Sequence, residues 1–155
     1  MTVTPSVQLL LNPGFDQFYY IPTAWSYSVL GEKASYLSDC TVFISPNCSL
    51  KLVSARSTRI VTQIVSRTGL AGDQYIFGLS SSAFNIPGGG TYKVEASLFN
   101  RFNRVMYTQR LNFTIGTHGF ETVNGIFTAP GAYNKIVFRI TLQKTAGMAW
   151  FDDAF

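Results

Sequence analysis

Charged residues, histidine and cysteine are all scarce in this chain. Asp, Glu, Lys and Arg make up only 13% of its 155 residues, about half of the usual share. The single histidine, His118, and the two cysteines are too few for a closed four-ligand zinc site. Much of the surface must therefore consist of Ser, Thr, Asn, Gln, Gly and aromatic groups, which suit packing or the binding of a sugar.

Long apolar segments are also missing. No uninterrupted apolar run approaches the roughly 20 residues that a membrane helix needs, and the N-terminus has neither the basic region nor the apolar core of a signal peptide. We therefore expect no membrane span. The expected setting is extracellular, at the cell surface or in a virion. Either the chain is a mature secreted chain or an excised module whose signal is gone, or it leaves the cell by a route that needs none, as a virion protein does.

The net charge gives little indication of a partner, because the excess of +4 is dispersed along the chain. One segment faintly resembles a nucleic-acid surface, since it combines arginines with aromatic rings: Arg101, Phe102, Arg104, Tyr107 and Arg110. A solvated turn and strand is the favoured alternative, because outward Lys and Arg side chains discourage edge-to-edge aggregation. We therefore do not expect a nucleic-acid partner.

Length and apolar content indicate one folded domain. A chain of this length buries roughly 70% of the surface that its unfolded form exposes. The hydrophobic content of 46% and the aromatic content of 15% argue against disorder. Because no internal repeat, low-complexity tract or linker interrupts the chain, we assign residues 1–6 to a short N-terminal arm and residues 7–155 to a single domain.

The two cysteines, Cys40 and Cys48, bracket the short segment 41–47. This spacing allows a loop or hairpin to close through a disulfide in an oxidising environment. Closure would stabilise the fold by roughly 2–3 kcal/mol in the chain-entropy model. Two reduced and partly buried thiols are the alternative, and the sequence leaves both open.

Apolar and polar residues alternate with a period of two over much of the chain, and no segment carries a helical stripe over three turns. The alternation is clearest in 135–143 and in 92–99, which follows the Pro87–Gly90 turn. Shorter or less regular strand candidates are 7–11, 34–37, 49–54, 59–67, 74–81, 105–113, 120–128 and 148–155. Many short strands between Gly, Pro, Asn and Ser turns predict an all-β fold, an antiparallel sandwich or barrel.

Several short motifs, taken in order, resemble the β-sandwich carbohydrate-binding modules of families four, nine and twenty-two. They are Leu10-Leu11-Asn12-Pro13-Gly14-Phe15-Asp16, Ala24-Trp25, Ser49-Leu50-Lys51-Leu52, Gln63, Gly72-Asp73-Gln74-Tyr75 and Trp150-Phe151-Asp152-Asp153. The resemblance covers nearly the whole chain and implies an antiparallel β-sandwich of the jelly-roll, galactose-binding-like type. That fold is also found in adhesins, surface-layer proteins and phage structural proteins, so it does not by itself establish sugar binding.

Carboxylates lie beside hydrophobic strands at both ends of the chain. If the first and last strands pair, Asp16, Asp152 and Asp153 come together as oxygen donors suited to Ca2+. The resemblance also implies a structural ion at this place. The alternative is that these aspartates cap turns or remain solvated.

Aromatic residues are the second kind of candidate. The resemblance implies that Trp25 fills the core, and Trp150 is ambiguous. Tyr19, Tyr20 and Tyr27 lie in segments without regular patterning, where one of them could form a flat platform for sugar C–H groups. Core packing is the favoured role for each of them taken singly.

The resemblance implies sugar binding on the exposed concave face of one sheet or by loops at its rim. Outward positions of the alternating strands that could serve are Glu95, Ser97, Phe99, Arg110, Arg139, Thr141 and Gln143. Among these we select Glu95, Phe99, Arg110, Arg139 and Gln143 as ligand-binding candidates. The strands 92–99 and 135–143 carry little outward aromatic content beyond Phe99, which weakens the case for a deep polysaccharide cleft.

Catalysis has little support in the sequence. His118 lies between Thr117 and Gly119 in an expected loop, and no Ser or Cys nucleophile motif accompanies it. Glu95 and Glu121 are two carboxylates at unknown separation, which is weak support for a glycosidase pair. We therefore expect a non-catalytic carbohydrate-binding or adhesion module whose partner is a glycan or polysaccharide. A structural subunit that contacts copies of itself or other structural proteins, in a virion or an extracellular filament, is the alternative.

Overall fold

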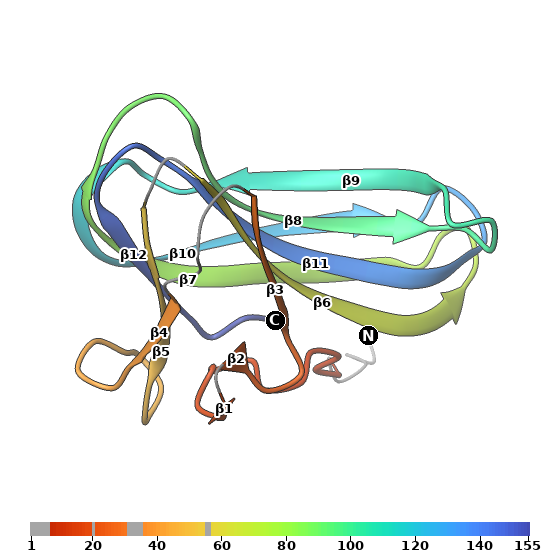
Figure 1. Cartoon of the computed structure of the whole chain (residues 1–155). Helices are drawn as coiled ribbons and strands as arrows, with labels where there is room; N and C mark the ends of the chain where they lie inside the picture. Colours follow the sequence, from red (N-terminus) through yellow and green to blue (C-terminus); the bar gives the residue numbers. More distant parts are fainter. Residues whose placement is uncertain (1–6, 20, 31–35, 55–56) are drawn as a thin grey trace, which may run out of the picture.

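The computed structural model describes residues 7–19, 21–30, 36–54 and 57–155, and these residues form β-strands, turns and loops without a helix. Two five-stranded antiparallel sheets make up most of the structure (Figure 1). This arrangement confirms the predicted all-β sandwich of the jelly-roll class. In the described ranges there is consequently no helix that could cross a membrane.

The first sheet has the strand order β10-β7-β12-β5-β4. Its strands are β10 (Gly116–Thr128), β7 (Gln74–Ile86), β12 (Met148–Asp152), β5 (Ser49–Val53) and β4 (Tyr36–Asp39). The second sheet has the order β3-β6-β11-β8-β9. Its strands are β3 (Ser26–Leu30), β6 (Thr58–Gly69), β11 (Tyr133–Gln143), β8 (Thr91–Phe99) and β9 (Val105–Asn112). A two-stranded ribbon, β1 (Phe18–Tyr19) and β2 (Ile21–Pro22), pairs with neither sheet.

The inner faces of the two sheets form the hydrophobic core. In β8 the inward positions follow the period of two: Tyr92, Val94, Ala96 and Leu98 are all buried. The inward residues of β11, namely Ile136, Phe138, Ile140 and Leu142, are buried opposite them in the same sheet. The intervening positions of these strands must then point away from the core, onto the outer face of the second sheet.

The beginning and the end of the described chain lie side by side. Gln8 Nε2 donates to the Ala154 carbonyl at 2.9 Å, and the Ala154 amide donates to the Pro13 carbonyl at 2.9 Å. Phe155 then exchanges two backbone hydrogen bonds with Gly78 in β7. These contacts hold the N-terminal segment against the end of β12.

Some local expectations differ from the structure. Residues 7–11 are not a strand, because the Gln63 side chain takes the place of a neighbouring strand: its Oε1 accepts from the Leu11 amide and its Nε2 donates to the Leu11 carbonyl. The edge strand β3 was not predicted from its sequence, Ser26-Tyr27-Ser28-Val29-Leu30, which ends in two consecutive apolar residues. The predicted arm, residues 1–6, lies outside the described residues.

Candidate functional site

A row of polar side chains crosses the outer face of the second sheet. The register places Glu95 of β8 opposite Arg110 of β9 on one side and Arg139 of β11 on the other. Arg139 lies opposite Thr62 of β6, which in turn lies opposite Ser26 of β3. Each of the five strands therefore contributes one residue to a single row, and three predicted ligand-binding residues are adjacent in it.

Glu95 is the centre of an ion-pair cluster. Its Oε2 accepts from Lys93 Nζ at 2.7 Å and from Arg110 Nε at 3.2 Å, and its Oε1 accepts from Arg139 Nη1 at 3.4 Å. Glu95 is only 6% exposed. Burial alone would raise its pKa, but the hydrogen bond from Lys93 and the positive charges of Lys93, Arg139 and Arg110 outweigh burial and hold the pKa below its usual range. Glu95 is therefore an anionic anchor for three cations at neutral pH.

Hydroxyl and apolar side chains occupy the neighbouring rows on either side of the Glu95 row. Ser97 Oγ and Thr108 Oγ1 are 2.8 Å apart, and Val137 of β11 lies opposite Ser97. Thr141, another predicted outward residue, is buried in the row on the other side of Glu95, between Lys93 and Ile60. The centre of this face therefore combines hydroxyl groups with apolar side chains.

The two remaining ligand-binding candidates lie at opposite ends of the face. Phe99 is half-buried at the end of β8, and Lys135 Nζ lies 4.6 Å from the centre of its ring. Gln143 is exposed at the end of β11, opposite Thr91. Each is four residues along its strand from the Glu95 row, about 13 Å at the usual rise of a strand. The structure therefore places all five candidates on one face but joins only Glu95, Arg110 and Arg139 directly.

Our sequence selection missed three side chains of this face: Lys93, Lys135 and the exposed Ile64 of β6. Lys93 is two residues from Glu95 and Lys135 is four residues from Arg139, so the period of two predicts that both point outward with them. This signal could have found them. Ile64 is 59% exposed opposite Val137. Its position could not be read from the sequence, because the register between β6 and β11 is a tertiary property.

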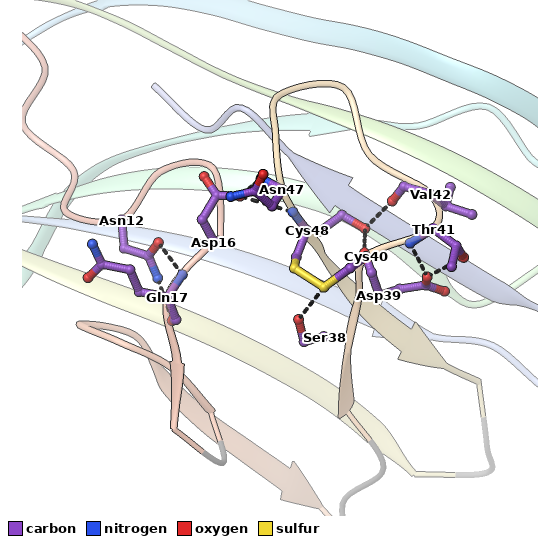
Figure 2. Close-up of a disulfide and its surroundings, with 11 residues drawn as sticks. Asn12, Asp16, Gln17, Ser38, Asp39, Cys40, Thr41, Val42, Asn47 and Cys48 are labelled. Carbon is purple, nitrogen blue, oxygen red and sulfur yellow. Dashed lines mark hydrogen bonds between the residues drawn. A yellow bond between two sulfur atoms is a disulfide. The ribbon is translucent and has the colours of Figure 1, made fainter.

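A second polar cluster joins both ends of the chain to the disulfide loop, residues 40–48. The structure links Cys40 to Cys48 by a disulfide, and Figure 2 shows Asp16 facing the end of this loop. Asp16 Oδ1 accepts from the backbone amides of Asn47 and Cys48. Asp16 thereby fixes the end of the loop next to β5.

Asp152 holds the middle of the same loop. Its Oδ2 accepts from the amides of Ile44 at 2.7 Å and Ser45 at 3.1 Å, and its Oδ1 accepts from Ser45 Oγ at 3.0 Å and the Asp153 amide at 2.8 Å. Asp152 is fully buried. Burial raises its pKa, although these hydrogen-bond donors act in the opposite direction. Four donors occupy about as many lone-pair positions as a carboxylate offers.

Hydrogen bonds occupy much of the aspartate cluster. A calcium ion takes six to eight oxygen ligands, whereas Asp152 is already saturated by N–H and O–H donors, Asp16 has one oxygen, Oδ2, outside these bonds, and the side chain of Asp153 is half-buried. No group of three or more His, Cys, Asp or Glu side chains that could hold a metal occurs in the described ranges. We therefore derive no role for the ion, and calcium binding by Asp16, Asp152 and Asp153 stays a prediction.

The other aromatic candidates do not share a surface. Trp25 is 3% exposed and packs in the core against Phe15 and Phe138, with ring centres 4.9 and 5.8 Å away. Tyr27 packs against the core and its hydroxyl accepts from Arg59. Trp150 belongs to the first sheet, where its Nε1 donates to Asp39. Tyr19 is in β1, and Tyr20 lies outside the described residues.

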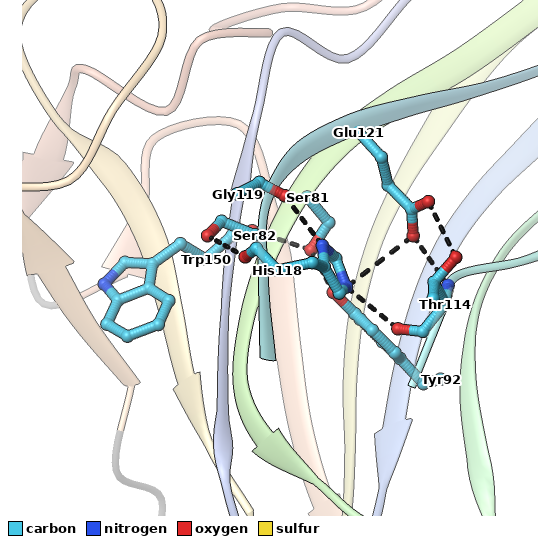
Figure 3. Close-up of polar contacts among 8 residues, drawn as sticks. All are labelled: Ser81, Ser82, Tyr92, Thr114, His118, Gly119, Glu121 and Trp150. Atoms are coloured by element: carbon cyan, nitrogen blue, oxygen red, sulfur yellow. Dashed lines mark hydrogen bonds and ion pairs between the residues drawn. The ribbon is translucent and has the colours of Figure 1, made fainter. Parts of the chain in front are cut away.

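His118 lies in β10 and not in the loop expected from the sequence (Figure 3). Its Nε2 is 2.8 Å from the Thr114 carbonyl and its Nδ1 is 2.7 Å from the Gly119 carbonyl. The Ser82 hydroxyl donates to the His118 backbone carbonyl and not to the ring. Both ring nitrogens are therefore engaged by the backbone, and this Ser–His arrangement does not form a nucleophile–base pair.

A hollow of about 830 Å³ opens between the two sheets, away from the polar row. Its walls are mainly apolar and include Phe77, Phe127, Ile136 and Phe138, while Gln8, Arg67, Gln74 and Tyr75 are its polar residues. Residues 7–10 close one side of it. Such walls offer few hydrogen-bonding partners, so the hollow is poorly suited to a polar ligand.

Comparisons with known proteins define the class to which this fold belongs. No protein-family model matches the sequence, and no curated protein matches it. Solved structures do match: the chain has the β-sandwich fold of carbohydrate-binding modules. At the sequence identities found, the likeness establishes the fold alone.

Three similar structures illustrate the likeness. A family-61 carbohydrate-binding module, TmCBM61 in complex with β-1,4-galactotriose, has a TM-score of 0.64 at 13% identity, over 97% of each chain. The xylan-binding domain from family twenty-two has a TM-score of 0.56 at 15% identity, over 97% of this chain and 94% of that one. The tailspike protein 4 enzymatically active domain of Bacteriophage CBA120 has a TM-score of 0.70 at 13% identity. That match covers 95% of this chain and 21% of the tailspike chain.

Proposed function

We propose that this protein is a non-catalytic module, extracellular or part of a virion, that binds a glycan across the outer face of the second sheet. The observation that carries the proposal is the row of Ser26, Thr62, Arg139, Glu95 and Arg110, one residue from each strand. Hydroxyl and guanidinium groups at fixed spacings offer hydrogen bonds to sugar hydroxyls. The fold shared with two carbohydrate-binding modules supports this assignment by analogy.

The proposed site is a face and not a deep cleft. The row extends over five strands, which spans about 19 Å at the usual spacing of neighbouring strands. Phe99 and Ile64 add apolar area at the Lys135 end of the face, where a sugar ring can place its C–H groups. A surface of this shape suits an extended saccharide chain better than a single monosaccharide.

A glycan screen followed by calorimetry tests the proposal. We expect saturable binding of at least one polysaccharide, weakened roughly tenfold by Arg139→Gln, which removes hydrogen bonds from a charged donor at the centre of the row. Asn124→Ala is the matched control, because Asn124 is an exposed residue of β10 in the other sheet. Retained folding of each variant is checked by its melting transition. Binding to no glycan, or equal loss with the control, would refute the proposed face.

One observation favours a second candidate, a structural subunit that assembles with copies of itself. Ile76 of β7 and Ile126 of β10 lie opposite each other in the first sheet, and they are 60% and 61% exposed. Phe155 adds a third apolar side chain, 38% exposed. Sedimentation velocity tests this candidate. Assembly into large particles that Ile126→Ser disrupts would support it, and a monomer at all concentrations would exclude it.

A further inference from the structure

The proposed glycan-binding face carries an excess of positive charge. Four cationic side chains project from it: Lys93, Arg110, Lys135 and Arg139. Among the described residues of that face, Glu95 is the single carboxylate. One anion cannot neutralise the cations, so the face keeps net positive charge at neutral pH. A neutral saccharide gains nothing from this excess.

Glu95 orients the two arginines without occupying all their donors. Its carboxylate accepts hydrogen bonds from Nε of Arg110 and from Nη1 of Arg139. The side chains of Arg110 and Arg139 are 63% and 41% exposed. Among the described residues no acceptor takes the Nη groups of Arg110 or the Nη2 of Arg139, whereas the Nε of Arg139 is buried and out of reach of a ligand. Further N–H groups of both guanidinium groups therefore stay open to a ligand.

Two such guanidinium groups match an anionic ligand. Arg110 and Arg139 lie on β9 and β11, with β8 between them, so their backbones are about 9–10 Å apart. Long side chains can converge over that distance. A guanidinium presents a planar fork of donors that fits a carboxylate or a sulfate. Because Glu95 holds both arginines, little side-chain entropy remains to be lost when the anion binds.

We propose that the glycan bound by this face is anionic, and that Arg110 and Arg139 hold its carboxylate or sulfate groups. This inference rests on the proposed function and names the class of saccharide. Phe99 is the single aromatic ring among the described residues of the outward rows, and Lys135 already lies over it. Stacking is therefore weak on this face, and charged hydrogen bonds supply the main source of affinity.

The face fits an acidic saccharide better than a nucleic acid. Sequence-tolerant binding of single-stranded nucleic acid combines a basic groove with several aromatic platforms. Here one partly covered ring stands beside the hydroxyl groups of Ser97 and Thr108, which suit sugar hydroxyls. Nucleic-acid binding is therefore an outcome to test and not the proposal.

The test compares matched ligands by calorimetry: polygalacturonate and its carboxyl-reduced neutral form, then dextran sulfate and dextran. We expect at least one anionic polymer to bind, its neutral partner to bind roughly tenfold more weakly or not at all, and affinity to fall as salt rises. The two acidic polymers distinguish a carboxylate ligand from a sulfate ligand. Oligo(dT) is included, and binding to it with equal affinity would overturn the proposal.

The variant Arg110→Gln measures how much the Arg110 guanidinium contributes to the affinity for the acidic polymer. Arg110 is the most exposed member of the cluster, so its replacement disturbs the fold least. We expect roughly tenfold weaker binding of the acidic polymer, while Arg101→Gln, which removes one exposed charge from the β8–β9 turn, has little effect. Equal loss in both variants would reduce the effect to net charge and overturn the proposal. Tight binding of neutral polysaccharides alone would overturn the anionic class but leave the glycan-binding function intact, whereas no binding to any glycan would refute both.

Discussion

Glu95 and Arg139 face each other across β8 and β11, and Arg139 Nη1 donates to Glu95 Oε1 at 3.4 Å. This pair lies at the centre of the outer face and links the folding of the second sheet to its proposed function. Replacing Glu95 removes a buried anion that three cations share. The consequences for stability and for binding can be measured separately.

Acid should weaken the fold partly through Glu95. Its folded pKa lies below the ordinary value of 4.5, so its contribution to stability is present above about pH 4.5 and is lost as the pH falls through the folded pKa. We expect the free energy of unfolding to decrease over this range in the wild type, and to decrease less steeply in Glu95→Gln. Urea denaturation at a series of pH values measures both slopes. Identical slopes would show that the cluster does not stabilise the folded state.

The disulfide should stabilise the loop that it closes. Replacing Cys40 and Cys48 together by serine frees segment 41–47, and we expect a loss of roughly 2–3 kcal/mol in the free energy of unfolding. Dithiothreitol should reproduce this loss in the wild type and leave the double variant unchanged. A wild type insensitive to the reductant under conditions that release its thiols would contradict the expectation.

Asp152 and Asp153 form a matched pair of neighbours with different roles. Asp152 is fully buried with four donors directed at it, whereas Asp153 is half-buried. Asp152→Asn replaces one acceptor oxygen by a donor group, and we expect a loss of about 2–4 kcal/mol. Asp153 has a φ of +49°, which Asn tolerates, so Asp153→Asn should change stability by less than about 0.5 kcal/mol. Guanidinium denaturation measures the free energy of unfolding of both variants. Equal losses in the two would show that Asp152 and Asp153 do not differ in their contribution to stability.

A calcium titration tests the prediction made from the terminal aspartates. Because hydrogen bonds from the disulfide loop already occupy Asp152, we expect the melting temperature to be the same in excess EGTA and in excess calcium. An ion that binds only the folded state raises stability with the logarithm of its concentration over its Kd. A rise that follows this dependence, and that Asp16→Asn abolishes, would establish calcium binding at this place.

The central strands β8 and β11 of the second sheet could be predicted well because the period of two fixes which side chains point outward. That parity placed Glu95, Phe99, Arg139 and Gln143 on one face without any knowledge of the register. It could not show that Glu95 lies directly opposite both Arg110 and Arg139, since a register slip changes every cross-strand pair. Sequence therefore predicted several members of the face, but not Lys93, Lys135 or Ile64, and not the cluster around Glu95.

The least predictable features depend on side chains that replace regular backbone pairing. The Gln63 side chain forms hydrogen bonds with the backbone of Leu11, so residues 7–11 do not form the strand that their sequence predicts. In the same way, the role of Asp152 depends on where the amides of the disulfide loop lie, which no local pattern encodes. The nearness of Asp16 and Asp152 was predicted, whereas the donors that surround them were not.

The central claim is that a glycan binds the outer face of the β3-β6-β11-β8-β9 sheet. The most direct measurement is an NMR titration of the ¹⁵N-labelled protein with an oligosaccharide of the polysaccharide that binds best. The account predicts shift changes concentrated at Glu95, Ser97, Arg110 and Arg139, with the amides of Ile76 and Ile126 in the other sheet unchanged. Changes confined to the first sheet, or none at saturating saccharide, would contradict it.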